Sequence, residues 1–375
     1  NSPAFHHILP EDEGPGDTTW FTDRQNPFEQ QVIRQQVAFR RARWPGLPNG
    51  PFSKQPNHTY PHILPPGEMR AFFDGFAAEV LAHMEQNDIA VHTEALNLKS
   101  SQVACINFLF PLQRDLVLAA NVFKALAARP SCAVFSNLAK VTNIEFEYTG
   151  QDETNRTSQP CTDWLGEPRS GKRGQNRTSI DAAIFWNDAA DKSHISLIEW
   201  KYTERNFGLC SAFEKAKAEM KDRCRALEVL EAPASQCVLA SQRRNCGRHY
   251  WELIPQAGIS LSKLDLVEGC PFQGPFYQLM RQFLVAHYLR IQHAADHVDV
   301  IAVEFEGNAA LRNVPEQLRP LRSAQGATVI DAWNAVLDGV PPMRSMTAEQ
   351  LLAAYDATPR TDPAWRQYIR ARYGM

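Results

Sequence analysis

The sequence predicts an α/β protein in which a mixed β-sheet is covered by helices. Segments with apolar residues at every third or fourth position predict amphipathic helices, whereas short runs rich in Ile, Phe, Trp and Tyr between polar segments predict buried strands. Along the chain the order is helix, three strands, helix and a further strand. This order predicts a sheet with helices packed on it, with irregular and helical additions at both ends.

The composition is that of a globular protein. Its 375 residues are 44% hydrophobic and 22% charged, which is enough for a sizeable core. No stretch approaches the roughly 18 to 20 apolar residues of a membrane span, and the first residues lack the basic-then-apolar pattern of a signal peptide. We therefore expect a soluble, cytoplasmic protein with no membrane contact, although a first residue other than Met leaves a removed leader open.

Three parts follow from the expected elements. Residues 1–66, rich in Pro, Asn and Gln, predict an irregular arm with one helix at 28–43. Residues 67–310 predict the core, and residues 311–375 predict a C-terminal extension of helices and loops. Core helices are expected at 68–86, 101–128, 212–231 and 276–292, and strands at 143–148, 179–186, 194–202, 237–240 and 298–305. Helices of the extension are expected at 327–337 and 348–355.

The most informative block is 178–204, which predicts two strands joined by a polar turn at 187–193. If this hairpin is symmetric about position 190, Asp181 lies opposite Glu199. Strand alternation places Lys201 on the same face as Glu199. The block therefore predicts two carboxylates and a lysine in one cluster.

Two facing carboxylates repel each other unless a cation lies between them. Magnesium binds carboxylate oxygens and keeps waters that can act as nucleophile, and Lys201 could lower the pKa of that water or hold the phosphate. This is the chemistry that phosphodiester hydrolysis requires. The alternative is an ordinary surface hairpin in which Lys201 forms a salt bridge with Asp181 or Glu199.

Asp181 followed by Glu199-Trp200-Lys201 resembles the motif of the PD-(D/E)XK nuclease superfamily, in which an Asp on the second core strand and an acid-x-Lys on the third form the metal site. Three further stretches are similar to a bacterial subfamily of restriction-endonuclease-like proteins: Ser100-Ser101-Gln102 before Asn107, Glu199 to Glu204, and Cys270-Pro271-Phe272 before Tyr277-Gln278-Leu279-x-Arg281. The likeness covers residues 90–306. It implies a restriction-endonuclease-like core with Asp181, Glu199 and Lys201 as catalytic residues and Mg²⁺ or Mn²⁺ held by the acids.

The same resemblance implies a third acid and a glutamine at the site. Glu147 is the preferred acid, as catalytic residue and metal ligand, with Glu145 and Glu94 as alternatives and Gln102 as a polar stand-in on the first core helix. Gln278 resembles the glutamine of a late helix that reaches the active site in RecB-like nucleases. Packing and helix capping would explain Gln278 equally well.

Contact with nucleic acid must depend on local basic patches, because the net charge is −3. An insertion at 150–178 should place its tip near the predicted metal site, and its cations would grip phosphates. These cations are Arg156, Arg169, Lys172, Arg173 and Arg177. A solvated loop is the alternative. Two smaller basic stretches lie at 32–43 and 366–372.

The eight cysteines include no Cys-x-x-Cys pair, which argues against a zinc ribbon and against a disulfide scaffold. Most of them are expected to be reduced packing residues. Some nucleases of the resembled kind carry four cysteines around the core, and five cysteines follow the predicted catalytic strands here: Cys210, Cys224, Cys237, Cys246 and Cys270. Their wide spacing argues against an iron–sulfur cluster.

The leading hypothesis is a magnesium-dependent DNA endonuclease in host defence, restriction or DNA repair. One alternative is a nucleic-acid-binding module of the same fold that is inactive or gated by a partner, and another is a nuclease that acts on RNA. DNA is the expected partner, and a homodimer is left open. The sequence does not decide between endonucleolytic and exonucleolytic cleavage.

Overall fold

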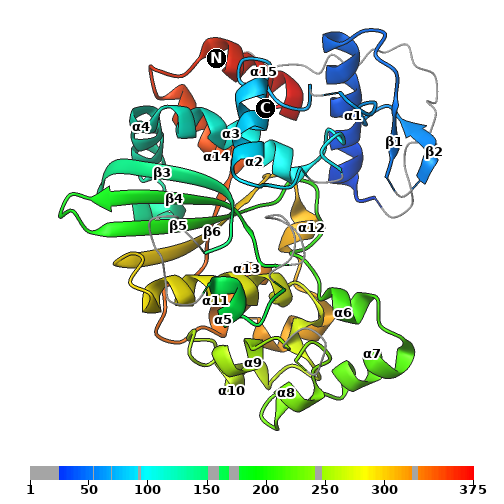
Figure 1. Cartoon of the computed structure of the whole chain (residues 1–375), viewed down its shortest axis with the longest axis vertical. Helices are drawn as coiled ribbons and strands as arrows, with labels where there is room; N and C mark the ends of the chain where they lie inside the picture. Colours follow the sequence, from blue (N-terminus) through cyan, green and yellow to red (C-terminus); the bar gives the residue numbers. More distant parts are fainter. Residues whose placement is uncertain are drawn as a thin grey trace.

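The centre of the molecule is a five-stranded sheet with the strand order β3-β4-β5-β6-β7 (Figure 1). The computed structural model describes residues 25–53, 55–68, 70–91, 94–150, 160–168, 177–240, 247–322 and 328–375. The strands are β3 (Leu138–Tyr148), β4 (Ile180–Asp188), β5 (Ser193–Trp200), β6 (His297–Glu304) and β7 (Arg344–Thr347). β3, β4 and β5 are antiparallel, whereas β5, β6 and β7 are parallel. The predicted mixed α/β class is confirmed.

Helices cover both faces of this sheet. α3 (Ser101–Arg114) and α4 (Leu116–Leu126) pack on one face, and α11 (Phe276–Ile291) packs on the other (Figure 1). In β4, Ile184 lies in the core beneath α3 and α4, whereas its neighbour Ala183 lies in the core beneath α11. The inner strands are buried on both faces, which explains their nearly continuous apolar runs.

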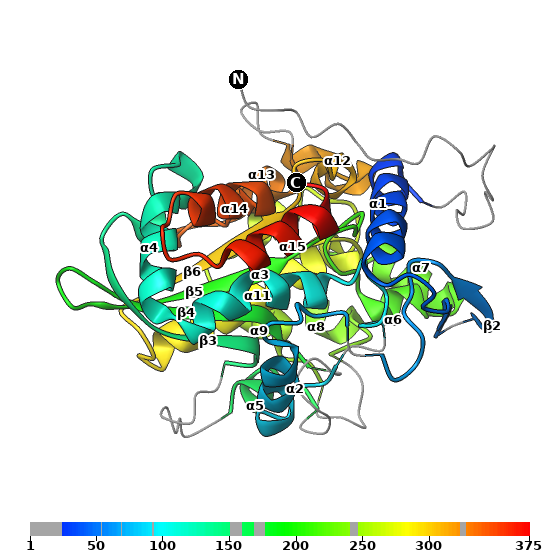
Figure 2. The same ribbon diagram turned by 90° about the horizontal axis from the view of Figure 1, so that it is seen from above.

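Segments near both ends of the described chain pack on the same core. α1 (Pro27–Arg43) lies beside α15 (Pro363–Tyr373) (Figure 2). Nε2 of Gln36 in α1 donates to the Tyr202 hydroxyl at 2.9 Å and to the Arg372 carbonyl at 2.8 Å. α14 (Ala348–Asp356) packs against α4. The domain boundaries at 66 and 310 remain a prediction.

Side-chain caps set the ends of several helices. Asn26 Oδ1 accepts the Glu29 N–H at 2.8 Å where α1 begins. Asp115 Oδ1 accepts the N–H groups of Val117 and Leu118 at 3.0 and 2.9 Å and so begins α4. The apolar pattern predicted one helix over 101–128, but the cap at Asp115 divides it into α3 and α4, which meet at a bend of 117°.

No single helix in the described ranges has the length and apolar character needed to cross a bilayer. Only α3 and α4 taken together, across their bend, meet the criterion of length and composition.

Several predicted elements differ from the structure. The predicted helix at 68–86 is helical only in α2 (Ala77–Gln86), and the one at 212–231 consists of α6 (Ser211–Glu214) and α7 (Ala218–Arg225). The predicted strand at 237–240 is wrong, because these residues form a turn after α8 (Pro233–Gln236). Val238 is buried against the α11 side of the core, and a short apolar run can reflect such packing as well as a strand.

A hairpin in the arm, the edge strand β7 and α15 were not predicted from the sequence. The hairpin is formed by β1 (Gly50–Phe52) and β2 (Gln55–Tyr60). These three strands are too short to give a clear periodicity. α15 spans 11 residues, and the helical spacing of its buried Trp365, Tyr368 and Ile369 could have identified it. The remaining short elements are η2 (Pro130–Phe135), α5 (Cys161–Trp164), α9 (Tyr250–Leu253), α10 (Leu261–Leu264), η3 (Pro271–Gln273), α12 (Ala309–Arg312), η4 (Glu316–Leu321) and α13 (Val329–Ala335).

Candidate active site

Three carboxylates lie in one row across β3, β4 and β5. Ala182 pairs with Ile198, and the β4–β5 ladder continues to the turn without a shift, as predicted. One step beyond Ala182 this register puts Asp181 opposite Glu199. In the β3–β4 ladder, Phe146 pairs with Ala182 and Tyr148 pairs with Ile180, so Glu147 lies opposite Asp181. The two registers therefore bring Glu147, Asp181 and Glu199 to the same end of the sheet.

Asp181, the middle acid, lies at the edge of a cleft and is partly exposed. Its Oδ2 accepts the backbone N–H of Trp200 at 2.6 Å. The surrounding protein desolvates the carboxyl group and raises its pKa well above the ordinary value, and the Glu199 and Glu147 carboxylates raise it further. Lys201 and the Trp200 N–H oppose this shift only in part. Asp181 is thus a carboxyl group that a bound cation would stabilise in its charged form.

Glu199 is fully enclosed, with 1% of its side chain exposed, and both of its oxygens are occupied. Nζ of Lys201 lies 2.7 Å from Oε1, and Nε2 of Gln278 donates to the same oxygen at 2.5 Å. Nε2 of Gln282 donates to Oε2. Burial raises the pKa of Glu199, and the positive charge of Lys201 counteracts this shift. The three donors fix the orientation of the carboxylate.

Glu147 has a backbone φ of +48°, which is uncommon for a residue other than glycine. Its side chain is held by Nε2 of Gln102, which donates to Oε1 at 2.7 Å, and by the Ser179 hydroxyl, which donates to Oε2 at 2.7 Å. A conformation of this kind costs on the order of 1 to 3 kcal/mol and persists where the surroundings determine it. Such strain is concentrated at functional sites.

Gln278 connects α11 to the loop that follows β5. Its Oε1 accepts the Gly208 N–H at 2.5 Å while its Nε2 donates to Glu199. A Cβ at Gly208 would lie 3.0 Å from Gln278 Oε1, so glycine permits this close approach. Gln278 therefore reaches the acid row from the late helix. Gln282, which the sequence analysis missed, follows one helical turn later and could have been found by its spacing.

A cleft of about 430 Å³ opens beside the row and is lined by both acids and cations. The acids are Glu94, Glu147, Asp181 and Glu204, and the cations are Lys99, Arg177 and Arg281. Lys99 forms an ion pair with Glu29. Arg281 Nε donates to the Thr178 hydroxyl at 2.9 Å and lies 3.6 Å from Glu167 Oε1. The same cleft therefore presents both the acids of the row and cations that could bind an anion.

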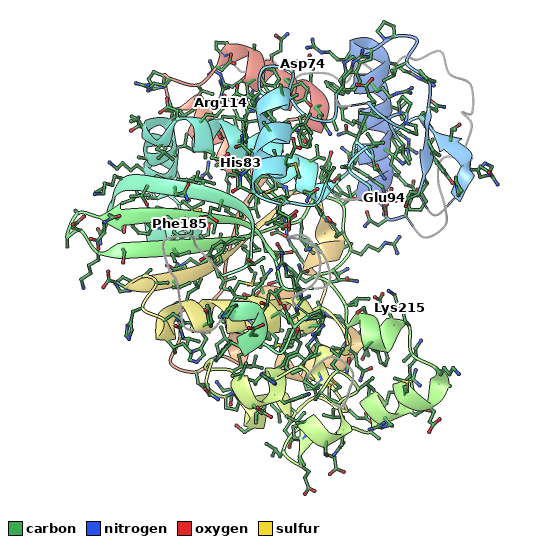
Figure 3. The ribbon with its side chains drawn as sticks, in the orientation of Figure 1. Asp74, His83, Glu94, Arg114, Phe185 and Lys215 are labelled. Atoms are coloured by element: carbon green, nitrogen blue, oxygen red, sulfur yellow. The ribbon has the colours of Figure 1, made fainter. Side chains whose placement is uncertain are left out.

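The other predicted site residues have different positions. Glu94 lines the cleft near the lower end of α1, where it accepts a hydrogen bond from the Ser53 hydroxyl (Figure 3). Glu145 is partly exposed on β3, and its Oε1 accepts from Asn143 Nδ2 at 3.2 Å. Arg177 lines the cleft. The predicted phosphate contacts Arg156, Arg169, Lys172 and Arg173 lie outside the described residues.

In the ranges that the structure describes, no three His, Cys, Asp or Glu side chains form a group close enough to hold a metal ion by themselves. The donor set at the acid row nevertheless suits a hard divalent cation, which prefers carboxylate, carbonyl and water oxygens. Asp181 borders the cleft, and its neighbours raise its pKa by like-charge repulsion that a cation would relieve.

A mixed sheet with helices on both faces, and an acid row followed by a lysine at the end of the central hairpin, define a restriction-endonuclease-like protein. Residues 42–374 match the family described as restriction endonuclease associating with ARP, and the chain belongs to this family. The resemblance inferred from the sequence is confirmed. Comparison with curated proteins and with solved structures gives no match.

Proposed function

We propose that this chain is a divalent-metal-dependent nuclease that hydrolyses phosphodiester bonds in DNA. The observation that carries the proposal is the row of Glu147, Asp181 and Glu199 with Lys201 paired to its last member. Three neighbouring acids, two of them buried, are costly to maintain unless they bind a cation. Magnesium or manganese, when bound, would activate a water and neutralise charge on the phosphate.

Asp181 is the residue of the row best placed to meet both the cation and the substrate, because it borders the cleft. Glu147, which Gln102 and Ser179 hold in place, supplies a second carboxylate at the same cleft. Glu199 is the third member; it does not line the cleft, and Gln278 and Gln282 orient it. We assign Gln278 as a positioning residue that acts through Glu199.

Lys201 is assigned as a fixed positive charge. Burial alone would lower its pKa, but the neighbouring carboxylates, those of Glu199 and Glu204 foremost, outweigh burial and raise it. The lysine is therefore protonated at neutral pH and cannot act as a general base there. Its role would be to stabilise the negative charge that develops on the phosphate.

DNA is proposed as the substrate because restriction endonuclease is part of the description of the matched family. Arg177, Lys99 and Arg281 would contact phosphates within the cleft. Contacts by Arg156, Arg169, Lys172 and Arg173 stay a prediction. A role in restriction or host defence accords with the family description, and a role in DNA repair, a cytoplasmic location and a homodimer also stay predictions.

One observation favours a second candidate, a nuclease of the same fold whose cleavage is gated by a partner. Both oxygens of Glu199 are already occupied by Lys201, Gln278 and Gln282. The family description is that of a restriction endonuclease associating with ARP, which accords with a partner. A partner that shifts α11 would free Glu199 and switch on cleavage.

The test is a comparison of linear duplex DNA, nicked circular DNA, single-stranded DNA and RNA as substrates, each with magnesium. Cleavage of DNA alone supports the proposal. Cleavage of RNA alone would replace it with the ribonuclease alternative. Binding of DNA without cleavage in magnesium or manganese would favour the gated or inactive module.

A further inference from the structure

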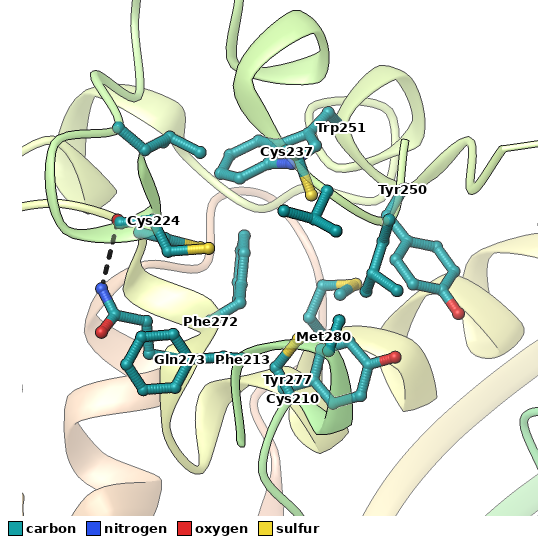
Figure 4. Close-up of a pocket in the computed structure, with 15 residues that line it drawn as sticks. Cys210, Phe213, Cys224, Cys237, Tyr250, Trp251, Phe272, Gln273, Tyr277 and Met280 are labelled. Atoms are coloured by element: carbon teal, nitrogen blue, oxygen red, sulfur yellow. Dashed lines mark hydrogen bonds between the residues drawn. The ribbon is translucent and has the colours of Figure 1, made fainter. Parts of the chain in front are cut away.

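A second cavity, of about 30 Å³, lies in the core beneath α11. Four cysteines line it: Cys210, Cys224, Cys237 and Cys270. Figure 4 shows the thiols of Cys210, Cys224 and Cys237 turned toward the interior of this cavity. The catalytic proposal uses none of these four residues.

The four cysteines come from four different segments. Cys210 precedes α6, Cys224 lies in α7, Cys237 follows α8, and Cys270 precedes η3. The Cys270 N–H donates to the Cys224 carbonyl at 2.8 Å, which joins two of the segments directly. Gly269 makes this approach feasible, because it has a φ of +72° and any Cβ there would lie 2.4 Å from the Arg225 carbonyl oxygen.

The rest of the cavity suits a ligand that must be shielded from water. Aromatic and thioether side chains form much of the wall, and the rings of Trp251 and Phe272 lie 5.2 Å apart within it. Burial raises the pKa of the Cys270 thiol well above its ordinary value, and the other three cysteines raise it further. The Phe272 N–H lowers it, as the N–H groups of Phe213 and Ala212 do at Cys210. Such N–H groups favour bound thiolates over free thiols.

Two simpler explanations fit less well. All seven described cysteines are free, so the group is not a pair of disulfides. A single zinc ion would need four sulfurs at about 2.3 Å from one centre. No three potential ligands in the described residues are close enough to hold one ion. In a four-iron cluster each thiolate binds a different iron atom. Its four cysteine sulfurs therefore lie farther apart than the four sulfurs around a single zinc ion.

We propose that Cys210, Cys224, Cys237 and Cys270 hold an iron–sulfur cluster. Each thiol would lose its proton and form one Fe–S bond. The spacing of these cysteines argued against a cluster, but that argument applies only to ligands supplied by one loop. Here the fold brings together single cysteines from four segments.

The proposed cluster would stabilise the part of the chain between β5 and α11. This part consists of short helices, four of which span four residues each, and such helices have little stability of their own. Cys210 follows Gly208, which donates to Gln278, and Cys270 lies just before α11. The cluster would therefore support the two segments that meet at Gln278. The proposal does not depend on the nuclease assignment.

The test is the iron and acid-labile sulfide content of the full chain purified without oxygen, together with its visible absorption. We expect about four iron and four sulfide per chain, with broad charge-transfer absorption. Cys224→Ala and Cys270→Ala should lose both the iron and the absorption. Cys132→Ala is the matched control, because Cys132 is also buried but belongs to the other core, so its loss should leave the cluster intact.

Three outcomes would overturn the proposal. They are stoichiometric zinc without sulfide, a wild-type chain that contains no metal and four reduced thiols, and a loss of iron in Cys132→Ala equal to that in Cys270→Ala. Cys246 lies outside the described residues and serves as a check on the ligand set. If Cys246→Ala loses the cluster while Cys237→Ala keeps it, the assigned set is wrong.

Discussion

Nζ of Lys201 lies 2.7 Å from Oε1 of Glu199, in a site where 10% of the lysine and 1% of the glutamate side chain are exposed. The Glu-x-Lys segment of the sequence is therefore a buried ion pair. Removing one partner of such a pair leaves an uncompensated charge, which is strongly destabilising. Lys201 should therefore be needed both for the stability of the fold and for catalysis at this site.

Replacing Lys201 with Met should weaken both folding and catalysis. Stability should fall by on the order of 3 kcal/mol at neutral pH in metal-free buffer. Without Lys201 the pKa of Glu199, already raised by burial, should rise further. The deficit should therefore be largest above that pKa and should shrink as the pH falls and Glu199 takes up a proton. Thermal unfolding across pH measures this.

Lys140→Met is the control for this prediction. Lys140 forms an exposed pair with Asp191 at 3.6 Å, and such a pair contributes little. A Lys201→Met deficit that equals the Lys140→Met deficit, or that does not vary with pH, would show that the Lys201 pair is not buried as described.

Asp181→Asn should stabilise the metal-free protein at neutral pH. The pKa of Asp181 is higher in the folded than in the unfolded protein. The protonated carboxyl group therefore contributes to the free energy of unfolding at pH values below the unfolded-state pKa, and this contribution is lost as the pH rises through the folded-state pKa. Asn keeps an acceptor for the Trp200 N–H but cannot ionise. We expect a gain on the order of 1 kcal/mol at neutral pH that disappears in acid, measured by urea unfolding in chelator.

Asp191→Asn, in the exposed hairpin turn, should show no such gain. If Asp181→Asn is less stable than the wild type at every pH, the carboxyl group is not held under like-charge repulsion.

Glu147→Gly should be more stable than Glu147→Ala by about 1 kcal/mol. Both variants lose the hydrogen bonds from Gln102 and Ser179, so the cost of the positive φ for Ala is set only against the larger entropy that Gly loses on folding. The same two substitutions at Glu145 give the control, since Glu145 is not among the positive-φ residues and glycine should be the less stable choice there. An Ala variant that matches the Gly variant at position 147 would contradict the strained conformation.

The salt dependence of DNA binding tests the cleft. Arg177→Ala should reduce the slope of log affinity against log salt by roughly 0.9 if Arg177 contacts one phosphate. Joint replacement of Arg169, Lys172 and Arg173 should reduce it further, by a similar step for each phosphate that these side chains bind. Arg319→Ala, whose side chain forms an exposed pair with Glu316, should leave the slope unchanged. If Arg177→Ala gives the same slope as the wild type, the phosphate backbone of DNA does not bind in this cleft.

The sequence predicts those parts of the structure whose conformation is determined by a local apolar pattern or by strand register. The apolar strands, the symmetric hairpin and α11 follow from periodicity, and with them the positions of Asp181 and Glu199. Elements set by single side chains were missed, such as the break at Asp115. The positive φ at Glu147 and the meeting of four cysteines depend on packing between distant segments, which no local pattern encodes.

The most direct test of the metal-site proposal is cleavage of DNA by the wild type and by Asp181→Asn in magnesium, in calcium and in excess chelator, with binding measured alongside. Calcium activates water poorly, so it should support binding without cleavage. We predict cleavage by the wild type in magnesium only, and a loss of more than about 100-fold in Asp181→Asn with binding in calcium retained. Full-rate cleavage in chelator, or a wild-type rate from Asp181→Asn, would contradict the assignment of the acid row as a metal-dependent catalytic site.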